Sequence, residues 1–81
     1  MEGQIKHNLK KIILEQFNID EDKLGKVDNL YLLGLMPRDV LRLVLYIENE
    51  YDIHFTENEL VENKFDSIEN IALVVSKHIE E

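Results

Sequence analysis

The stretch of sequence that decides the fold runs from residue 37 to residue 51 and reads PRDVLRLVLYIENEY. Its apolar residues recur at spacings of three and four, which places a stripe of them on one face of a helix. That stripe consists of Val40, Leu43, Val44, Ile47 and Tyr51. Pro37 suits the first turn of such a helix, because its missing N–H would have no partner there anyway. Leu41, Leu45 and Tyr46 widen the apolar surface, so this segment is predicted to be the central helix of a bundle.

Two more long helices and one short helix are expected around the central one. The first long helix covers residues 5–17, where a second apolar stripe recurs at the same spacings. That stripe comprises Ile5, Leu9, Ile12, Ile13 and Phe17. Thr56 and Glu59 form the pattern of a capping box, which predicts a short helix ending near Glu62. Ser67 is the expected N-cap of the last helix. The apolar face of this helix comprises Ile68, Ile71, Ala72, Val75 and Ile79.

Residues 18–36 have no helical period and are predicted to form one long loop. Loops of this length are uncommon in compact domains unless they serve a function. Scattered leucines between the glycines and acidic residues of this segment indicate that it is held against the core. The whole chain, residues 1–81, is expected to form a single all-α domain.

Composition and charge limit the partners that the chain can have. With 17 acidic and 9 basic residues, the formal net charge is −8. Such a surface repels phosphate backbones and anionic headgroups, so neither nucleic acid nor a membrane surface is an expected partner. The absence of cysteine excludes disulfides and thiolate chemistry and fits a reducing compartment. No apolar run approaches the ~18 residues of a membrane span, and a cytoplasmic location is expected.

Three blocks of the sequence carry a resemblance to a known family. They are LKKIILEQ at residues 9–16, DVLRLVL at 39–45 and ENEYDI at 48–53, and Leu33-Gly34 precedes the second block. Over nearly the whole chain these features resemble the acyl carrier protein family. The resemblance implies a four-helix bundle with three long helices and one short helix. The family works by joining 4′-phosphopantetheine to the serine of an Asp-Ser-Leu motif that follows a Leu-Gly pair.

The sequence departs from that family at the attachment point. In the matching register, Met36, Pro37 and Arg38 occupy the Asp, Ser and Leu positions. Proline has no side-chain nucleophile and its two neighbours have no hydroxyl, so 4′-phosphopantetheine is predicted to be absent. A second Asp-Ser pair ends at Ser67, but only 14 residues follow it, too few for the later helices of the family.

The resemblance also implies a docking surface, because carrier proteins present acidic side chains of their second helix to basic grooves of partner enzymes. Asp39 and Glu48 keep that acidic character, whereas Arg38 and Arg42 break it. These arginines fit two interpretations: they are ordinary solvated charges, or they alter the partner preference, because like charges placed together can reject a partner. The predicted partner-docking residues are Leu35, Met36, Arg38, Asp39, Arg42 and Glu48.

These observations favour a monomeric, carrier-like adaptor that docks on a biosynthetic or peptide-modifying enzyme without a covalent arm. Arm-less relatives of this kind resemble the acyl-carrier-related proteins of bacterial peptide-maturation systems. Two alternatives remain: a working acyl or peptidyl carrier in fatty-acid or natural-product synthesis, and a helical bundle that binds a small hydrophobic ligand. No catalytic constellation is evident, and His7, His54 and His78 lack the short spacing of zinc sites, so neither an enzyme nor a metal site is expected.

Overall fold

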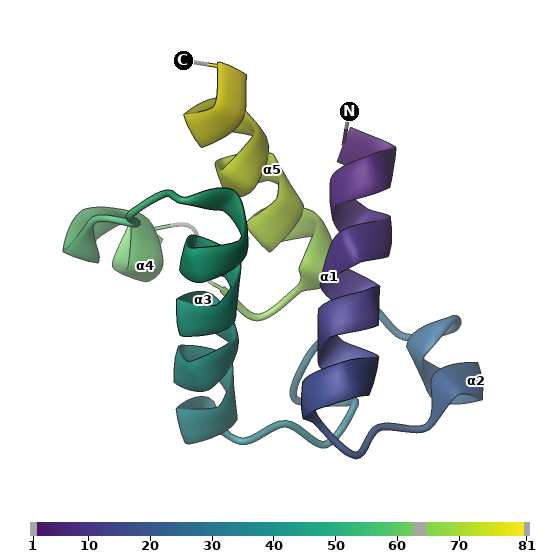
Figure 1. Cartoon of the computed structure of the whole chain (residues 1–81). Coiled ribbons are helices and arrows are strands. Elements are labelled where there is room, and N and C mark those ends of the chain that lie inside the picture. The colour runs from purple at the N-terminus through teal and green to yellow at the C-terminus, as the bar shows by residue number, and fades with distance from the viewer. Residues whose placement is uncertain (1, 63–64, 81) are drawn as a thin grey trace.

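The computed structural model describes residues 2–62 and 65–80 of the chain. Its helices are α1 (Glu2–Gln16), α2 (Glu21–Leu24), α3 (Pro37–Tyr51), α4 (Glu57–Glu62) and α5 (Ile68–Glu80). Within these ranges there is no strand, only an isolated bridge between residues 29 and 67. The prediction of an all-α fold is therefore confirmed. Figure 1 shows α1 and α3 running in opposite directions with α5 beside them, and both termini at the same end of the molecule.

The three long helices and the short one that were expected are present, and the described residues contain one more, five in all. The additional helix, α2, is a single turn inside the segment that was expected to be a loop. Asp20 starts it by accepting a hydrogen bond from the backbone N–H of Asp22 at 3.0 Å, and Leu24 buries its side chain in the core. Four residues are too few to show a helical period, which explains why the pattern of the sequence did not indicate this helix.

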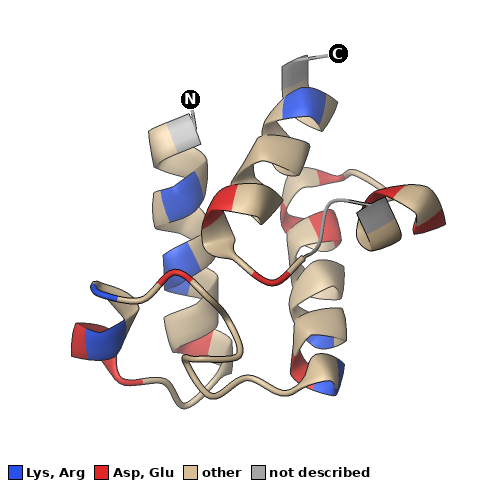
Figure 2. Ribbon diagram, turned by 180° about the vertical axis from the view of Figure 1, so that it is seen from behind, with Lys and Arg blue, Asp and Glu red and all other residues tan. Residues whose placement is uncertain are grey.

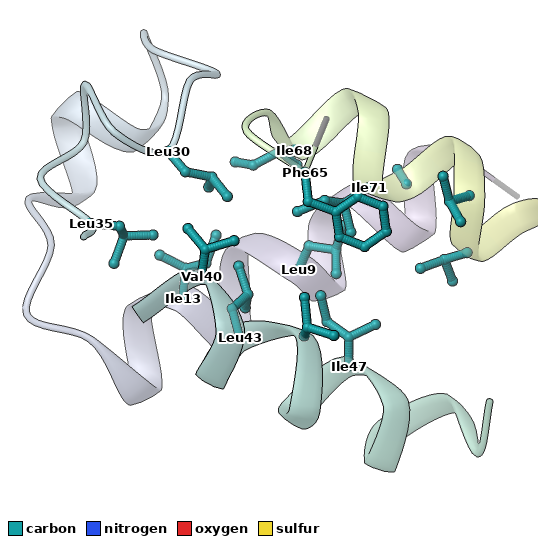
Figure 3. Packing of buried hydrophobic residues seen from close by; sticks show 14 of the residues in the cluster. Leu9, Ile13, Leu30, Leu35, Val40, Leu43, Ile47, Phe65, Ile68 and Ile71 are labelled. Carbon is teal, nitrogen blue, oxygen red and sulfur yellow. The ribbon is translucent and has the colours of Figure 1, made fainter. Parts of the chain in front are cut away.

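The core lies where the three long helices face one another. Its fully buried side chains come from all three helices and from the loop, and those of the helices lie on the apolar faces that the periodicity predicted. They are Leu9, Ile13, Leu30, Leu43, Ile47, Ile68, Ile71 and Val75, and most of them are labelled in Figure 3. Burying such a side chain stabilises the fold by roughly 1.5–3 kcal/mol relative to leaving it exposed. Ile79, which was also assigned to the apolar face of the last helix, is 38% exposed. Phe55 and Phe65 extend the core toward α4, with their ring centroids 5.1 Å apart.

The loop that precedes α3 is fastened to the start of α5. The backbone N–H of Leu30 donates to the carbonyl of Asp66 at 2.7 Å, and the N–H of Ile68 donates to the carbonyl of Asp28 at 3.2 Å. Leu30 itself is completely buried, so the prediction that leucines hold this segment to the core is confirmed. Gly34 has a φ of 104°, a conformation that glycine adopts without a steric penalty. This turn brings the chain to the first residue of α3.

Both predicted N-terminal caps are present. At α4, the N–H of Thr56 donates to the Glu59 carboxylate at 2.8 Å, and the N–H of Glu59 donates to the Thr56 hydroxyl at 3.1 Å. At α5, the Ser67 hydroxyl accepts a hydrogen bond from the N–H of Asn70 at 3.1 Å. Each cap satisfies backbone donors that a helix end would otherwise leave without partners.

Candidate functional site

The candidate site is the outward face of the N-terminal half of α3, which begins at the position where the resemblance places an attached cofactor. Met36 is the N-cap of α3 and Pro37 is its first residue. Oδ2 of Asp39 accepts a hydrogen bond from the backbone N–H of Met36 at 2.9 Å, so this carboxylate stabilises the start of the helix. Met36, Pro37 and Arg38 are all exposed, and none of them has a hydroxyl. The residues present therefore do not fit the attachment of 4′-phosphopantetheine at this point.

Three of the six predicted docking residues do not belong to this face. One is Asp39, which caps the helix start and whose side chain is 24% exposed. Leu35 is only 3% exposed and lies in the core, where Figure 3 shows it directed toward Val40. The side chain of Glu48 is 16% exposed, and its Oε2 accepts a hydrogen bond from the backbone N–H of Phe55 at 2.8 Å. Glu48 thus joins the last turn of α3 to the segment that follows it. The prediction that Leu35, Asp39 and Glu48 present docking surface has to be corrected, because all three side chains serve the fold.

Two exposed leucines that were not among the predicted docking residues also lie on this face. Leu41 and Leu45 are 62% and 64% exposed, and Met36 is 56% exposed. Leu41 and Leu45 are one turn apart, so they lie side by side along the helix. The signal for them was present in the sequence, because both fall off the stripe that forms the core. We call Met36, Arg38, Leu41, Arg42 and Leu45 the docking face.

Arg42 is held in place by three neighbours. Its guanidinium carbon lies 5.4 Å from the centroid of the Phe17 ring, Nη2 lies 3.5 Å from the hydroxyl of Tyr46, and Nη1 lies 3.9 Å from Oδ1 of Asp39. The rings of Phe17 and Tyr46 meet edge to face with centroids 6.3 Å apart. The side chain of Arg42 is nevertheless 54% exposed. A partner could therefore bind a guanidinium that already has a defined position.

Arg38 is placed differently, because no ion pair holds it. It is exposed in the first turn of α3, and the ion pairs formed by residues 2–62 and 65–80 do not include it. The N-terminal end of a helix has a partial positive charge, so a cation in this turn is electrostatically unfavourable. Figure 2 shows positive residues together with an acidic one at this end of α3, and negative residues at its other end and in α4.

An apolar groove lies beside the docking face. It has a volume of about 280 Å³ and runs between α3, the preceding loop and α4. Its lining is formed by Tyr31, Pro37, Val40, Leu41, Val44, Leu60 and Phe65. Leu41 belongs both to the groove and to the docking face, so the two form one continuous apolar surface.

A larger hollow lies between α1 and α2, away from the docking face. Its volume is about 480 Å³, and its lining includes Leu14, Leu24, Lys10 and Lys11. Glu15 and Glu21, from the same two helices, also line it. This surface therefore has mixed charge.

The three histidines lie apart from the docking face. The imidazole of His54 is almost fully exposed. His78 is half-buried between α4 and α5, with Nε2 2.8 Å from Oε2 of Glu59 and its ring 5.5 Å from that of Phe55. The hydrogen bond from the Thr56 backbone lowers the pKa of Glu59, and the neighbouring His78 lowers it further.

The described residues also bear on metal binding and on membrane insertion. Residues 2–62 and 65–80 contain no group of three or more His, Cys, Asp or Glu side chains that could hold a metal ion. No helix in this part of the chain has both the length and the apolar character needed to cross a bilayer.

Comparison with known proteins assigns no family to this arrangement. No protein-family model, curated protein or solved structure matches the chain. The resemblance to acyl carrier proteins is therefore carried by the sequence blocks quoted above and stays a prediction. The candidate site has to be interpreted from its own residues.

Proposed function

We propose that this protein is an adaptor that binds a partner protein through the docking face of α3 and carries no covalently attached cofactor. The observation that carries the proposal is the pair Leu41 and Leu45, two leucines one turn apart that are each more than 60% exposed. The opposite face of the same helix already supplies its share of the core through Val40, Leu43 and Ile47. The two exposed leucines are therefore not needed to bury α3.

Other features of the same surface support a protein partner. Single exposed apolar residues are common, but a group of them that continues into an apolar groove is typical of an interaction site. Arginine and large apolar side chains are enriched at the centres of protein interfaces. The docking face combines Met36, Leu41 and Leu45 with Arg38 and Arg42. Under the resemblance to carrier proteins, the partner would be a biosynthetic or peptide-modifying enzyme.

A working carrier protein is less well supported, because neither serine of the chain is placed for modification. The hydroxyl of Ser67 caps α5 through its hydrogen bond with Asn70. Ser76 is 9% exposed and lies within α5. Pro37, at the position that matches the family's attachment serine, has no hydroxyl.

The groove beside α3 also supports a second candidate, the binding of a small hydrophobic ligand. The side chains that line it are apolar apart from the hydroxyl of Tyr31. Ligand pockets usually measure roughly 300–1,000 Å³ and enclose most of the ligand. At about 280 Å³ the groove lies just below that range, and the exposed leucines extend it outward. This geometry suits the side chains of a protein partner better than an enclosed small molecule.

The proposal is tested by charge substitution on the docking face. The protein is tagged and isolated from its native host in three forms: wild type, Leu41→Glu/Leu45→Glu, and Leu14→Glu/Leu73→Glu. The last variant is a matched control, because Leu14 and Leu73 are exposed leucines of α1 and α5. We expect one partner protein to be recovered with wild type and with the control but lost from the α3 variant. Circular dichroism verifies that all three forms remain helical, and retention of that partner by the α3 variant would refute the proposal.

A further inference from the structure

We infer that the docking face binds an acidic amphipathic helix of the partner protein. This inference rests on the proposed function, which it extends by naming the chemistry of the partner. The net charge of −8 would by itself favour a basic partner. The docking face, however, is positive where the whole protein is negative. Short-range contacts depend on this local charge, because salt screens exposed charges beyond about 8–10 Å.

The exposed charge on the docking face comes from two arginines. Arg38 and Arg42 are one turn apart on α3, so their side chains lie on the same side of the helix. The nearest carboxylate on this helix, Asp39, is engaged by the N–H of Met36 and lies 3.9 Å from Arg42. Glu48 is engaged by the N–H of Phe55 at the far end of α3. The face therefore presents positive charge beside Leu41 and Leu45.

Arg38 is in a position that helix stability would give to an anion. The first turn of a helix favours acidic side chains, and Asp39 in the same turn follows that rule. Arg38 breaks it and gains no ion pair from the described residues in return. Residues that break a local rule without compensation inside the fold are expected at functional sites. A carboxylate supplied by a partner would provide the missing compensation.

Arg42 is suited to bind such a carboxylate. Its contacts with Phe17, Tyr46 and Asp39 restrict the guanidinium before any partner arrives. A restricted side chain loses less conformational entropy on binding than a mobile one. The planar guanidinium has five N–H donors and can bind a carboxylate through two parallel hydrogen bonds.

The apolar part of the surface favours a helix as the binding element. Amphipathic helices bind by placing side chains spaced three and four residues apart into an apolar groove. Here the groove lined by Val44 and Leu60 continues into the exposed side chains of Leu41 and Leu45. A partner helix with an apolar stripe flanked by glutamate or aspartate would complement both the groove and the arginines.

A second surface that contains lysines has to be distinguished from the docking face. Lys10 and Lys11 lie at the α1–α2 hollow, where Glu15 and Glu21 oppose their charge. An acidic peptide that binds there would follow the lysines and not the docking face. The experiment therefore has to locate the bound peptide as well as measure its affinity.

Two designed helical peptides of equal length and identical leucine stripe serve as probes, one with glutamate and one with lysine at its polar positions. Each is titrated into the ¹⁵N-labelled full chain, and the backbone amide shifts locate the binding surface. We expect the glutamate peptide to shift the amide signals of residues 38–45. It should bind at least about tenfold more tightly than the lysine peptide. The variant Arg38→Glu/Arg42→Glu should reverse that preference. The control variant Lys10→Glu/Lys11→Glu should keep it.

Three results would overturn the inference: equal or tighter binding of the lysine peptide to the docking face, binding of the glutamate peptide at the α1–α2 lysines, or no binding of either peptide to the docking face. Arg42→Gln is measured in parallel, because it weakens the site without placing a new anion beside Asp39.

Binding of the native partner distinguishes this inference from the proposed function on which it rests. A partner lost from Leu41→Glu/Leu45→Glu but kept by Arg38→Glu/Arg42→Glu would leave the adaptor in place and refute the acidic helix. A partner kept by both variants would refute the adaptor as well.

Discussion

The guanidinium of Arg42 in α3 lies over the ring of Phe17, the residue that follows α1, at 5.4 Å from its centroid. This contact joins the two helices at the end of the molecule where the docking face begins. Phe17 also packs against the core. One aromatic residue therefore contributes to the fold and positions a charged group that remains accessible.

Replacing Phe17 by leucine should weaken binding of an acidic peptide. A cation–π contact at an exposed site contributes about 0.5–1 kcal/mol, and leucine retains much of the apolar contact while removing the ring. We expect the Kd for the glutamate peptide to rise by about two- to fivefold. Titration measures this change, and Phe17→Tyr is the control because it keeps an aromatic face. An unchanged Kd in Phe17→Leu would show that the ring does not position Arg42 for binding.

Arg38→Glu should make the isolated protein more stable. The substitution replaces a cation by an anion in the first turn of α3, where the helix end is positive, and the expected gain is about 0.3–1 kcal/mol in the free energy of unfolding. Urea unfolding at low salt measures the gain, which should shrink as salt is added because the site is exposed. Arg38→Gln should lie between the two. A loss of stability would indicate that Arg38 has a favourable role in the fold, which would remove one support for the acidic partner.

Glu48→Ala should destabilise the fold without affecting docking. The substitution removes the acceptor of the Phe55 N–H, and a hydrogen bond to a charged group contributes about 1.5–3 kcal/mol. Glu48→Gln keeps an acceptor oxygen and should cost less. Urea unfolding measures both effects. If Glu48→Gln weakened partner binding while the fold stayed intact, the original prediction of Glu48 as a docking residue would be restored.

The sequence predicted the buried helix faces correctly but the roles of Glu48 and Leu35 incorrectly, and this difference has a physical explanation. Apolar periodicity reports which face of a helix is buried, so the three long helices and their core stripes could be predicted. The role of Glu48 depends on the N–H of Phe55, seven residues further along the chain. A pattern along one helix cannot distinguish this carboxylate from one that faces water. Leu35 lies outside any helix, where no period indicates whether a side chain points inward.

The exposed residues of the docking face were also difficult to predict from the sequence. Leu41 and Leu45 fall off the core stripe, which was visible in the sequence, but an apolar residue there can equally meet another part of its own chain. The tertiary structure leaves both leucines exposed, and helix periodicity alone does not determine this. The restraint of Arg42 depends on Phe17, 25 residues earlier, and could not be predicted from local spacing.

Glu59 should make stability depend on pH in the acid range. Its pKa is lowered in the folded protein, first by the hydrogen bond from the Thr56 backbone and then by His78. The unfolded chain therefore takes up a proton at this carboxyl more readily than the folded protein does. The contribution to stability is present above the ordinary glutamate pKa of about 4.3 and is lost as the pH falls through the lower pKa of the folded state.

The variant Glu59→Gln lacks this contribution, so its free energy of unfolding should fall less steeply below about pH 5 than that of wild type. Urea unfolding over a pH series gives the two slopes. Glu57→Gln is the control, because Glu57 is an exposed residue of the same helix. Equal slopes for wild type and Glu59→Gln would contradict the assignment of this pH dependence to Glu59.

Incubation with coenzyme A and a broad-specificity phosphopantetheinyl transferase should leave the mass of the protein unchanged. The exposed start of α3 has Pro37 where a carrier protein would need a hydroxyl, Ser67 uses its hydroxyl to cap α5, and Ser76 is buried. The triple variant Met36→Asp/Pro37→Ser/Arg38→Leu should remain folded, because Asp39 can still cap the backbone at position 36 and the first turn of a helix tolerates serine. Intact-mass spectrometry and circular dichroism check both forms. A gain of one phosphopantetheine group by the wild-type protein would refute the arm-less adaptor. Loss of the fold in the triple variant would show that Met36, Pro37 and Arg38 stabilise the start of α3 in a way that the match to acyl carrier proteins does not predict.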